Sequence, residues 1–465
     1  MRVSIDEQVL AGGAAGAHRV RELVGVALDA VTEAATARTG PVPAGGPPAV
    51  AAALAGLDLM PEHGVGDDAA LAELSRLLTA GSVDPSHPWC AAHLHGPTLA
   101  VAAAADLVAS MLNPSMDSWD QAPVSSELER ELTTALARLC FPAAPHADAV
   151  ITSGGTESNT LGLLLAREAG ATQPVCGANA HHSVARASWL LGLPAPLVVE
   201  TEHGRMRPDH LAEVLGSVAG RAIVVATAGT TDTGEIDPLP EIAAVAAAAG
   251  AWLHVDAAYG GAVLFSERLA PRLAGLELAD SMALDLHKLG WQPIAAGVFA
   301  ARDADALAAL SVRADYLNAA DDTEAGMPDL LGRSLRTSRR PDCLKLAVTF
   351  RALGREGIAA LVEHCCSLAV DAAAAVRAHP ALRLWGEPAL STVLLRPTVA
   401  DGLSTADGDA LVADIRRRLM ESGRAVLGRA TVDGQVWLKL TLLHPGATPA
   451  DYVGLLDLIA TTADE

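Results

Sequence analysis

The chain of 465 residues is predicted to be an α/β protein with a mostly parallel sheet and a smaller α+β domain at its C-terminal end. The first observation is a series of short apolar segments, typical of buried strands, at residues 148–152, 196–200, 222–228, 252–256 and 295–301. The second is that helical segments lie between most of them, which is the pattern of a parallel sheet covered on both faces. The third is a hydrophobic content of 51%, enough to fill a large core.

The elements are expected in three successive regions. Residues 1–85 are rich in Ala and Gly and contain a dense Pro/Gly stretch at 40–50, which predicts a helical arm, a loop and a further helix. Residues 86–345 contain the alternating strands and helices and are expected to form a large domain. Residues 346–465 continue a long helix and contain the strand-like segments STVLLRP and VWLKLTLL, so they are expected to form a small domain.

Composition and charge exclude several classes of function. A formal net charge of −22 argues against binding to nucleic acid or to an anionic membrane surface. A negative field can attract a cationic substrate, but solubility is the simpler explanation. The sequence shows no secretory signal and no apolar stretch that predicts a membrane span. Its 6 cysteines lack paired or metal-site spacing, so we expect a cytoplasmic protein with free thiols and no metal centre.

Three polar segments follow predicted strands, where open parallel sheets carry their active sites. The first is TSGGTESN at residues 152–159, which leads from a strand into a helix. Small residues and the free N–H groups of a helix N-terminus suit a phosphate group around Gly154, Gly155 and Thr156. An ordinary glycine-rich turn between a strand and a helix is the alternative interpretation.

The other two segments are HVDAAYGG at 254–261 and DLHK at 285–288. Asp256 ends a buried strand and needs a positive partner there, such as a protonated pyridine nitrogen, unless it only caps the next helix. Lys288 is either a solvated surface lysine or an amine that forms a Schiff base with a carbonyl cofactor. The three segments together provide a phosphate-binding turn, an acid for a ring nitrogen and an amine for an aldehyde. Pyridoxal phosphate contains a phosphate, a pyridine nitrogen and an aldehyde, so it matches all three.

These motifs, in this order, resemble those of the group II pyridoxal-dependent decarboxylases. The resemblance extends from about His87 to the C-terminus and includes HLHGPT at 93–98 and WLKLTLLHP at 437–445. It implies fold type I, the fold of aspartate aminotransferase, with a mostly parallel seven-stranded sheet in the large domain. It also implies a homodimer whose active site lies at the subunit interface. Within the family, the motifs are similar to the bacterial branch of L-2,4-diaminobutyrate and lysine decarboxylases.

The resemblance also implies roles for individual residues. Lys288 would hold pyridoxal phosphate covalently, Asp256 would pair with its ring nitrogen, and His181 would stack on its ring. Without the resemblance, the pair His181 and His182 would be interpreted as a polar cluster at a helix terminus. Further cofactor contacts are implied for Gly154, Gly155, Thr156, Thr231, Ala258 and His287. The implied reaction is decarboxylation, in which the orientation of the substrate carboxylate decides which bond breaks.

Substrate residues follow from the same alignment. Thr98 stands where relatives contact the substrate carboxylate, and Lys439 matches a basic position that holds the α-carboxylate in glutamate-specific relatives. Asp117 replaces a Phe that aromatic-substrate relatives contribute from the neighbouring subunit. A carboxylate there suits a distal ammonium group, so we expect a basic or diamino acid such as 2,4-diaminobutyrate, lysine or ornithine; a loop cap is the alternative for Asp117. Gly96 and Gly290 replace larger residues, which predicts room for a longer or branched substrate.

One departure from the family leaves the outcome of the reaction open. Aromatic amino-acid decarboxylases use a loop Tyr to protonate Cα, and Leu330 stands at that position here. His181, Tyr316 and Lys288 are the alternative proton donors. Loss of the Tyr in plant relatives accompanies oxidative deamination to an aldehyde, which is the second hypothesis. Decarboxylation of an acidic or aromatic amino acid, and an inactive interaction protein on the same scaffold, are the others.

Overall fold

The computed structural model describes residues 10–311 and 317–465. Its largest element is a seven-stranded sheet in the order β2-β10-β9-β8-β7-β3-β4. Strand β10 is antiparallel to both of its neighbours, and the pairs among β9, β8, β7, β3 and β4 are all parallel. The strands are β2 (Asp148–Thr152), β3 (Ala171–Gly177), β4 (Leu197–Val199), β7 (Arg221–Thr227), β8 (Trp252–Asp256), β9 (Ser281–Asp285) and β10 (Gly297–Ala301). The predicted α/β fold with a mostly parallel sheet is confirmed.

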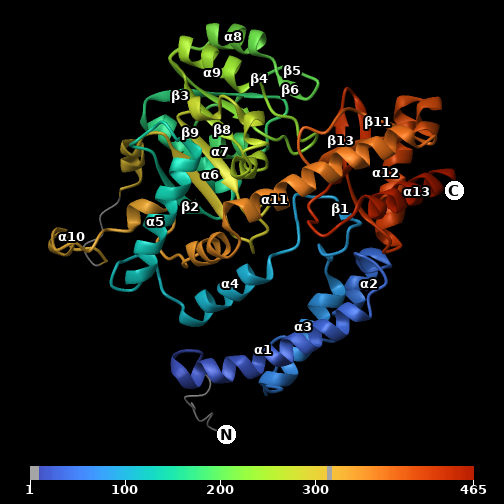
Figure 1. The fold of residues 1–465 in the computed structure, drawn as a ribbon, viewed down its shortest axis with the longest axis horizontal. Helices are drawn as coiled ribbons and strands as arrows, with labels where there is room; N and C mark the ends of the chain where they lie inside the picture. The colour runs from blue at the N-terminus through green and yellow to red at the C-terminus, as the bar shows by residue number, and fades with distance from the viewer. Residues whose placement is uncertain (1–9, 312–316) are drawn as a thin grey trace.

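Helices cover both faces of this sheet, so its strands are buried on both sides (Figure 1). Strand β7 shows the alternation, because Val224 and Ala226 join one core and Ile223 and Val225 join the other. The first core also takes residues from α5, α8 and α9, and the second takes residues from α6 and α7. These helices are α5 (Pro123–Cys140), α6 (Gly155–Glu168), α7 (Ser183–Leu190), α8 (Pro208–Gly216) and α9 (Leu239–Ala248).

Strand β3 was not among the strands predicted from the sequence. Its sequence, ATQPVCG, contains polar residues and Pro174, which cannot donate a backbone hydrogen bond. It nevertheless pairs with β7 on one side and β4 on the other, with a register shift between Ala171 and Gln173. The central position of β3 between two strands therefore outweighs its weak local preference.

A second sheet of five strands lies at the C-terminal side, in the order β1-β13-β14-β12-β11. Its strands are β1 (Cys90–Ala91), β11 (Leu382–Leu384), β12 (Thr392–Pro397), β13 (Val426–Val432) and β14 (Gln435–Thr441), flanked by α12 (Thr405–Glu421) and α13 (Pro449–Asp464). The short β1 pairs in parallel with β13. The chain therefore contributes a strand to this sheet before it enters the seven-stranded sheet.

Two features join the sheets. The long helix α11 (Cys343–Ala378), which is broken at Gly354, contributes residues to the cores of both. It is the one helix in the described part of the chain that is long and apolar enough to cross a membrane, and 44% of its most apolar window is buried, as in a core helix. The second feature is Tyr259, whose buried hydroxyl bonds to Ser391 Oγ and Thr392 Oγ1 at 2.8 and 2.9 Å and accepts the Ser391 N–H.

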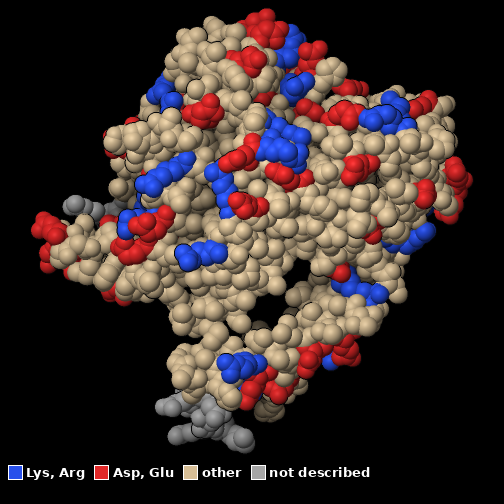
Figure 2. All heavy atoms as spheres, viewed as in Figure 1, with Lys and Arg blue, Asp and Glu red and all other residues tan. Residues whose placement is uncertain are grey.

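The N-terminal arm, residues 10–81, extends away from the two sheets (Figure 1). It consists of α1 (Gly13–Thr36), α2 (Gly46–Ala53) and α3 (Asp67–Gly81), and α1 packs along α3. Helix α2 lies partly in the Pro/Gly-dense stretch expected to be a loop, since proline fits the first turn of a helix. Figure 2 shows an opening between the arm and the rest of the molecule. Large apolar side chains on the arm are exposed, including Leu28, Leu59, Met60 and Leu78.

The remaining elements are short or peripheral. They are α4 (Ala100–Leu112), α10 (Ala320–Glu324), the two-stranded sheet of β5 (Thr201–Glu202) and β6 (Arg205–Met206), and the 3-10 helices η2 (Gly260–Phe265), η3 (Ala270–Leu273), η4 (Leu276–Leu278), η5 (Ala304–Leu310), η6 (Leu331–Arg333) and η7 (Thr398–Gly402).

Candidate active site

A cavity of about 310 Å³ lies at the carboxyl ends of β8 and β9, beside the start of α6. Its volume is within the range of small-molecule sites, and its position at the strand ends is that of active sites in open α/β sheets. The residues implied by the resemblance as cofactor contacts all line it. They are Gly154, Gly155, Thr156, His181, Thr231, Asp256, Ala258, His287 and Lys288.

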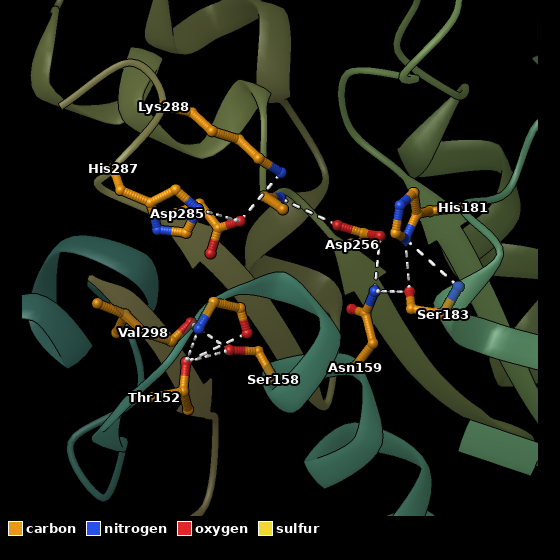
Figure 3. Close-up of polar contacts among 12 residues, drawn as sticks. Thr152, Ser158, Asn159, His181, Ser183, Asp256, Asp285, His287, Lys288 and Val298 are labelled. Atoms are coloured by element: carbon orange, nitrogen blue, oxygen red, sulfur yellow. Dashed lines mark hydrogen bonds and ion pairs between the residues drawn. The ribbon is translucent and has the colours of Figure 1, made fainter. Parts of the chain in front are cut away.

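Asp256 is held at one end of the cavity by two hydrogen bonds. Its Oδ1 accepts the backbone N–H of Ala258 at 3.0 Å, and its Oδ2 accepts Asn159 Nδ2 at 2.7 Å (Figure 3). The carboxylate is 5% exposed and lines the cavity. A buried carboxylate with neutral donors and an opening toward a cavity is suited to pairing with a cationic group there.

His181 lies on the same side of the cavity. Its Nδ1 contacts Ser183 Oγ at 2.8 Å and the Ser183 backbone nitrogen at 3.3 Å (Figure 3). Because that backbone N–H can only donate, Nδ1 is the acceptor, and the neutral ring carries its proton on Nε2. Desolvation lowers the pKa of His181, although Asp256 acts in the opposite direction. The ring is therefore neutral at pH 7 and available for stacking.

The turn before α6 forms another wall of the cavity. Thr152 Oγ1 and Ser158 Oγ lie 2.7 Å apart, and the Ser158 N–H bonds to Gly154 O at 3.0 Å, so the turn is closed by its own residues (Figure 3). Gly154 has a φ of 150°, and a Cβ there would lie 2.9 Å from His287 Cε1. A Cβ at Gly155 would lie 2.9 Å from Ala258 Cβ. The two glycines therefore keep open the space at the helix N-terminus, where an anion is favoured.

Lys288 lies across the cavity from Asp256. Its Nζ is 2.9 Å from Asp285 Oδ2, and His287 Nε2 is 3.6 Å from the same oxygen (Figure 3). Burial lowers the pKa of His287. The sequence did not predict Asp285 as a site residue. Its place as the first residue of the DLHK motif, three residues before Lys288, was the signal that could have identified it.

The polar atoms around Lys288 are incompletely bonded. Within the described residues, Asp285 Oδ1 and His287 Nδ1 are buried and have no hydrogen-bond partner. The same holds for Thr227 Oγ1, on the strand position that pairs with Asp256. Unpaired buried polar atoms are costly and are expected where a ligand completes the site. An open turn at a helix N-terminus, a lysine amine and a buried carboxylate match the phosphate, aldehyde and ring nitrogen of pyridoxal phosphate. The residues present therefore fit this cofactor.

The three residues predicted to contact substrate do not line this cavity. Lys439 comes nearest, because its Nζ donates to the carbonyl oxygen of Thr231 at 2.9 Å, and burial lowers its pKa. Asp117 is buried in a loop, where its Oδ1 accepts Gln121 Nε2 at 2.8 Å. The chain by itself thus brings together the predicted cofactor residues but not Thr98 and Asp117.

The chain alone does not support the prediction that Gly96 and Gly290 enlarge the substrate site. A Cβ at Gly96 would meet Leu443 O at 3.1 Å and Trp291 Cδ1 at 3.2 Å. A Cβ at Gly290 would lie 2.4 Å from the carbonyl oxygen of Leu286. Neither glycine lines the cavity, because both are used for close packing of the chain against itself. Leu94 and Ile294, which the sequence did not single out, supply apolar walls instead.

The candidate proton donors are only partly described. Leu330 is buried just before η6 and carries no transferable proton. Tyr316 lies outside the described residues. His181 and Lys288 both line the cavity.

Comparisons with known proteins agree with this geometry. Residues 59–397 match the family described as "Pyridoxal-dependent decarboxylase conserved domain", so the match begins before His87, where the resemblance was expected to start. An L-2,4-diaminobutyrate decarboxylase of Rhizobium meliloti (strain 1021) is 43% identical over 88% of this chain and 84% of its own. A second one, of Acinetobacter baumannii, is 34% identical over 87% and 85%.

A solved structure shares the whole architecture. It is the glutamate decarboxylase domain of diaminobutyrate-pyruvate transaminase and L-2,4-diaminobutyrate decarboxylase from Vibrio parahaemolyticus. It is 30% identical, with a TM-score of 0.86 over 98% of this chain and 97% of that one. The chain therefore belongs to the pyridoxal-dependent decarboxylase family, has fold type I, and is an amino-acid decarboxylase whose cofactor is pyridoxal phosphate.

Proposed function

We propose that this enzyme decarboxylates a basic or diamino acid, with L-2,4-diaminobutyrate as the first candidate, to the amine and carbon dioxide. The observation that carries the chemistry is the convergence of Lys288, Asp256, His181 and the turn before α6 on one cavity. The choice of substrate is supported by the two bacterial relatives named as L-2,4-diaminobutyrate decarboxylases, at 43% and 34% identity.

The residues divide the work by position. When bound, pyridoxal phosphate supplies the electron sink for the pair left by the departing carboxylate. Lys288 would hold the cofactor covalently, and Asp256 would keep its ring nitrogen protonated. His181 would lie against the ring and, together with Lys288, is a candidate donor of the proton that Cα receives. The turn around Gly155 and Thr156 would hold the phosphate and so fix the ring against which the substrate carboxylate is oriented.

The substrate end of the site requires a second subunit in this proposal. Asp117 is absent from the cavity lining of its own chain, and the N-terminal arm exposes Leu28, Leu59 and Met60. The exposed apolar side chains support a homodimer in which the arm is covered, and the family resemblance places Asp117 at the neighbouring cavity of that dimer. Its carboxylate would then pair with the distal ammonium group of the substrate, and Lys439 beside Thr231 would favour a substrate carboxylate.

The test is a carbon-dioxide release assay across 2,4-diaminobutyrate, ornithine, lysine, glutamate, aspartate and an aromatic amino acid. We expect the diamino acids to react fastest. Asp117→Asn should lose selectivity for them without losing bound cofactor, while Glu213→Gln, which removes an exposed acid on α8, serves as the control. Preference for an acidic or aromatic substrate in the native enzyme would overturn the role of Asp117.

The subunit arrangement has its own test. An inactive Asp117→Arg variant mixed with inactive Lys288→Ala should recover activity, up to roughly a quarter of the native level, because mixed dimers contain one intact site. No recovery in dimers shown to exchange subunits would contradict an interfacial site.

Formation of an aldehyde is the second candidate, and the observation that favours it is Leu330 at the position of the loop Tyr. Product analysis separates the two: an amine and carbon dioxide, against an aldehyde with ammonia and hydrogen peroxide. We also propose a cytoplasmic location, supported by 6 cysteines that are all free. Cell fractionation tests it.

A further inference from the structure

Behind Asp256, a set of buried side chains that the proposed reaction does not use forms one continuous hydrogen-bonded chain. Asn159 Nδ2 lies 2.7 Å from Asp256 Oδ2, and Asn159 Oδ1 lies 3.0 Å from His254 Nε2. His254 Nδ1 lies 2.9 Å from Ser281 Oγ, which also receives Trp252 Nε1–H at 3.2 Å. The members come from α6, β8 and β9, so the chain crosses from one strand to the next beneath the cavity.

The direction of every hydrogen bond in this chain follows from chemistry. The Asp256 carboxylate only accepts, so the amide nitrogen of Asn159 faces it and the amide oxygen faces His254. His254 Nε2 must therefore donate, which leaves Nδ1 as the acceptor of the neutral ring. The Ser281 hydroxyl donates to Nδ1 because Nδ1 is unprotonated, and its oxygen also accepts the indole N–H of Trp252, which is a donor only. All the bonds thus point toward Asp256.

The burial of His254 supports this protonation state. Its side chain is inaccessible to solvent, and desolvation lowers its pKa to about 4, against the opposing effects of Asp256 and of the Ser281 backbone. Among the residues that the structure describes, Asp256 is the one charged group that shifts this pKa. His254 is therefore neutral at pH 7, with one donor and one acceptor, as the chain requires.

The backbone of α6 is adapted to the ring of His254. A Cβ on Gly162 would lie 2.5 Å from His254 Nδ1 and 2.6 Å from its Cε1. Glycine in the middle of a helix lowers helix stability. Its presence here is explained by the His254 ring, which fills the space that any side chain at position 162 would need.

A branch of the same network reaches His181. The second Nδ2 hydrogen of Asn159 is directed at Ser183 Oγ, 2.8 Å away, and the Ser183 hydroxyl contacts His181 Nδ1. The Asn159 amide therefore contacts both Asp256, which is proposed to pair with the ring nitrogen of the cofactor, and Ser183, which contacts the His181 ring (Figure 3).

We propose that Asn159 is a positioning residue for the reaction, locked in one orientation by His254 and Ser281, and that it stabilises the charge on Asp256 and orients the Ser183 hydroxyl toward His181 Nδ1. Hydrogen bonds that point the same way polarise one another, so the chain stabilises the Asp256 anion without adding a charge. The proposal depends on the function proposed above for Asp256 at the ring nitrogen.

The test uses full-length enzyme loaded with pyridoxal phosphate and measures the pH at which its visible absorbance changes. A less positive ring nitrogen in the cofactor lets the Lys288 nitrogen keep its proton to higher pH. Weakening the hydrogen-bonded chain behind Asp256 should therefore raise the midpoint pH of the absorbance change. We expect a rise of about 0.5–1 pH unit in His254→Phe and in Asn159→Leu. Ser281→Ala should give a smaller rise, and Asp256→Ala the largest.

Controls separate positioning from folding. Ser188→Ala removes an equally buried hydroxyl that bonds only to the Val184 carbonyl in its own helix, and it should leave the midpoint unchanged. The thermal midpoint of each cofactor-free variant reports on folding, and Ser281→Ala carries the test if His254→Phe does not fold. A lowered thermal midpoint with an unmoved absorbance midpoint in the chain variants would overturn the inference.

The two proposals fail in different ways. If Asp256→Ala raises the absorbance midpoint and Asn159→Leu, His254→Phe and Ser281→Ala do not, the positioning role is wrong and the role of Asp256 stands. If Asp256→Ala itself leaves the midpoint unchanged, the proposed role of Asp256 is wrong, and the positioning role falls with it.

Discussion

The two ends of the active-site cavity are built differently. At one end both oxygens of Asp256 are hydrogen-bonded, and the Asn159 amide behind it has its own partners. At the other end, Asp285 Oδ1 and His287 Nδ1 are buried without partners among the described residues. The Asp256 carboxylate is thus held by the protein alone, whereas Asp285 and His287 have atoms that only a ligand can bond. The difference predicts that changes at the first end alter chemistry, and that changes at the second end alter attachment and affinity.

The largest effect is expected from Lys288→Ala, which removes the covalent attachment at the second end. Carbon-dioxide release should fall at least about 10⁴-fold, because the cofactor can no longer be attached and exchanged through an amine. Borohydride reduction should no longer fix the visible absorbance to the protein. Fixation in this variant would show that another amine carries the cofactor.

Asp256→Asn tests the first end. The variant keeps the size of the side chain and loses its charge, so kcat should fall about 10²–10³-fold while the affinity for pyridoxal phosphate changes much less. Steady-state kinetics at saturating cofactor, with a separate cofactor titration, measure the two effects. A loss confined to cofactor affinity would remove the distinction between the two ends.

The completed end also predicts a pH-dependent stability. Unfolded His254 binds a proton below its ordinary pKa of 6.5, whereas burial lowers its pKa in the folded chain to about 4. Unfolding therefore takes up a proton between these values, and up to about 3 kcal/mol of stability is lost as the pH falls from 6.5 to 4. Denaturant unfolding at several pH values should show a flatter dependence in His254→Phe. An equally steep dependence would mean that His254 does not contribute.

The smallest effect is expected at the unfinished end, from His287→Ala. Loss of a hydrogen bond to a charged phosphate should weaken pyridoxal phosphate binding about ten- to hundredfold. Activity at saturating cofactor should be nearly unchanged. The cofactor-free variant should lose little stability, because removal of the unpartnered Nδ1 offsets part of the packing that the ring loses. Calorimetry with and without cofactor measures both, and a loss of stability larger than the loss of cofactor binding would contradict the comparison.

The sequence predicted the parallel sheet, and it singled out residues that line one cavity, for a local reason. A strand end with a conspicuous motif, such as Asp256 after WLHV, indicates both a strand and a candidate site in a few residues. Strand β3 was missed because Pro174 and its polar neighbours hide a strand that only tertiary pairing specifies. The packing around Gly96 was misjudged because alignment shows that a side chain is absent, but not that Leu443 and Trp291 fill its space.

The hydrogen-bonded chain behind Asp256 lay beyond sequence reasoning for a different reason. Asn159, His254 and Ser281 are separated by 95 and 27 positions, and no spacing connects them. Only the adjacency of β8 and β9, with α6 packed on them, brings them together.

The bonds of Tyr259 have a mechanical consequence. Tyr259 lies three residues after Asp256, and its hydroxyl is tied to Ser391 and Thr392 on the C-terminal sheet. A rotation of one sheet against the other must break these buried bonds, at about 1–3 kcal/mol for each group left unpaired. The strain would be transmitted over three residues to Asp256 at the end of β8. The relative orientation of the two sheets and the position of Asp256 are therefore coupled, and a ligand that shifts one should shift the other.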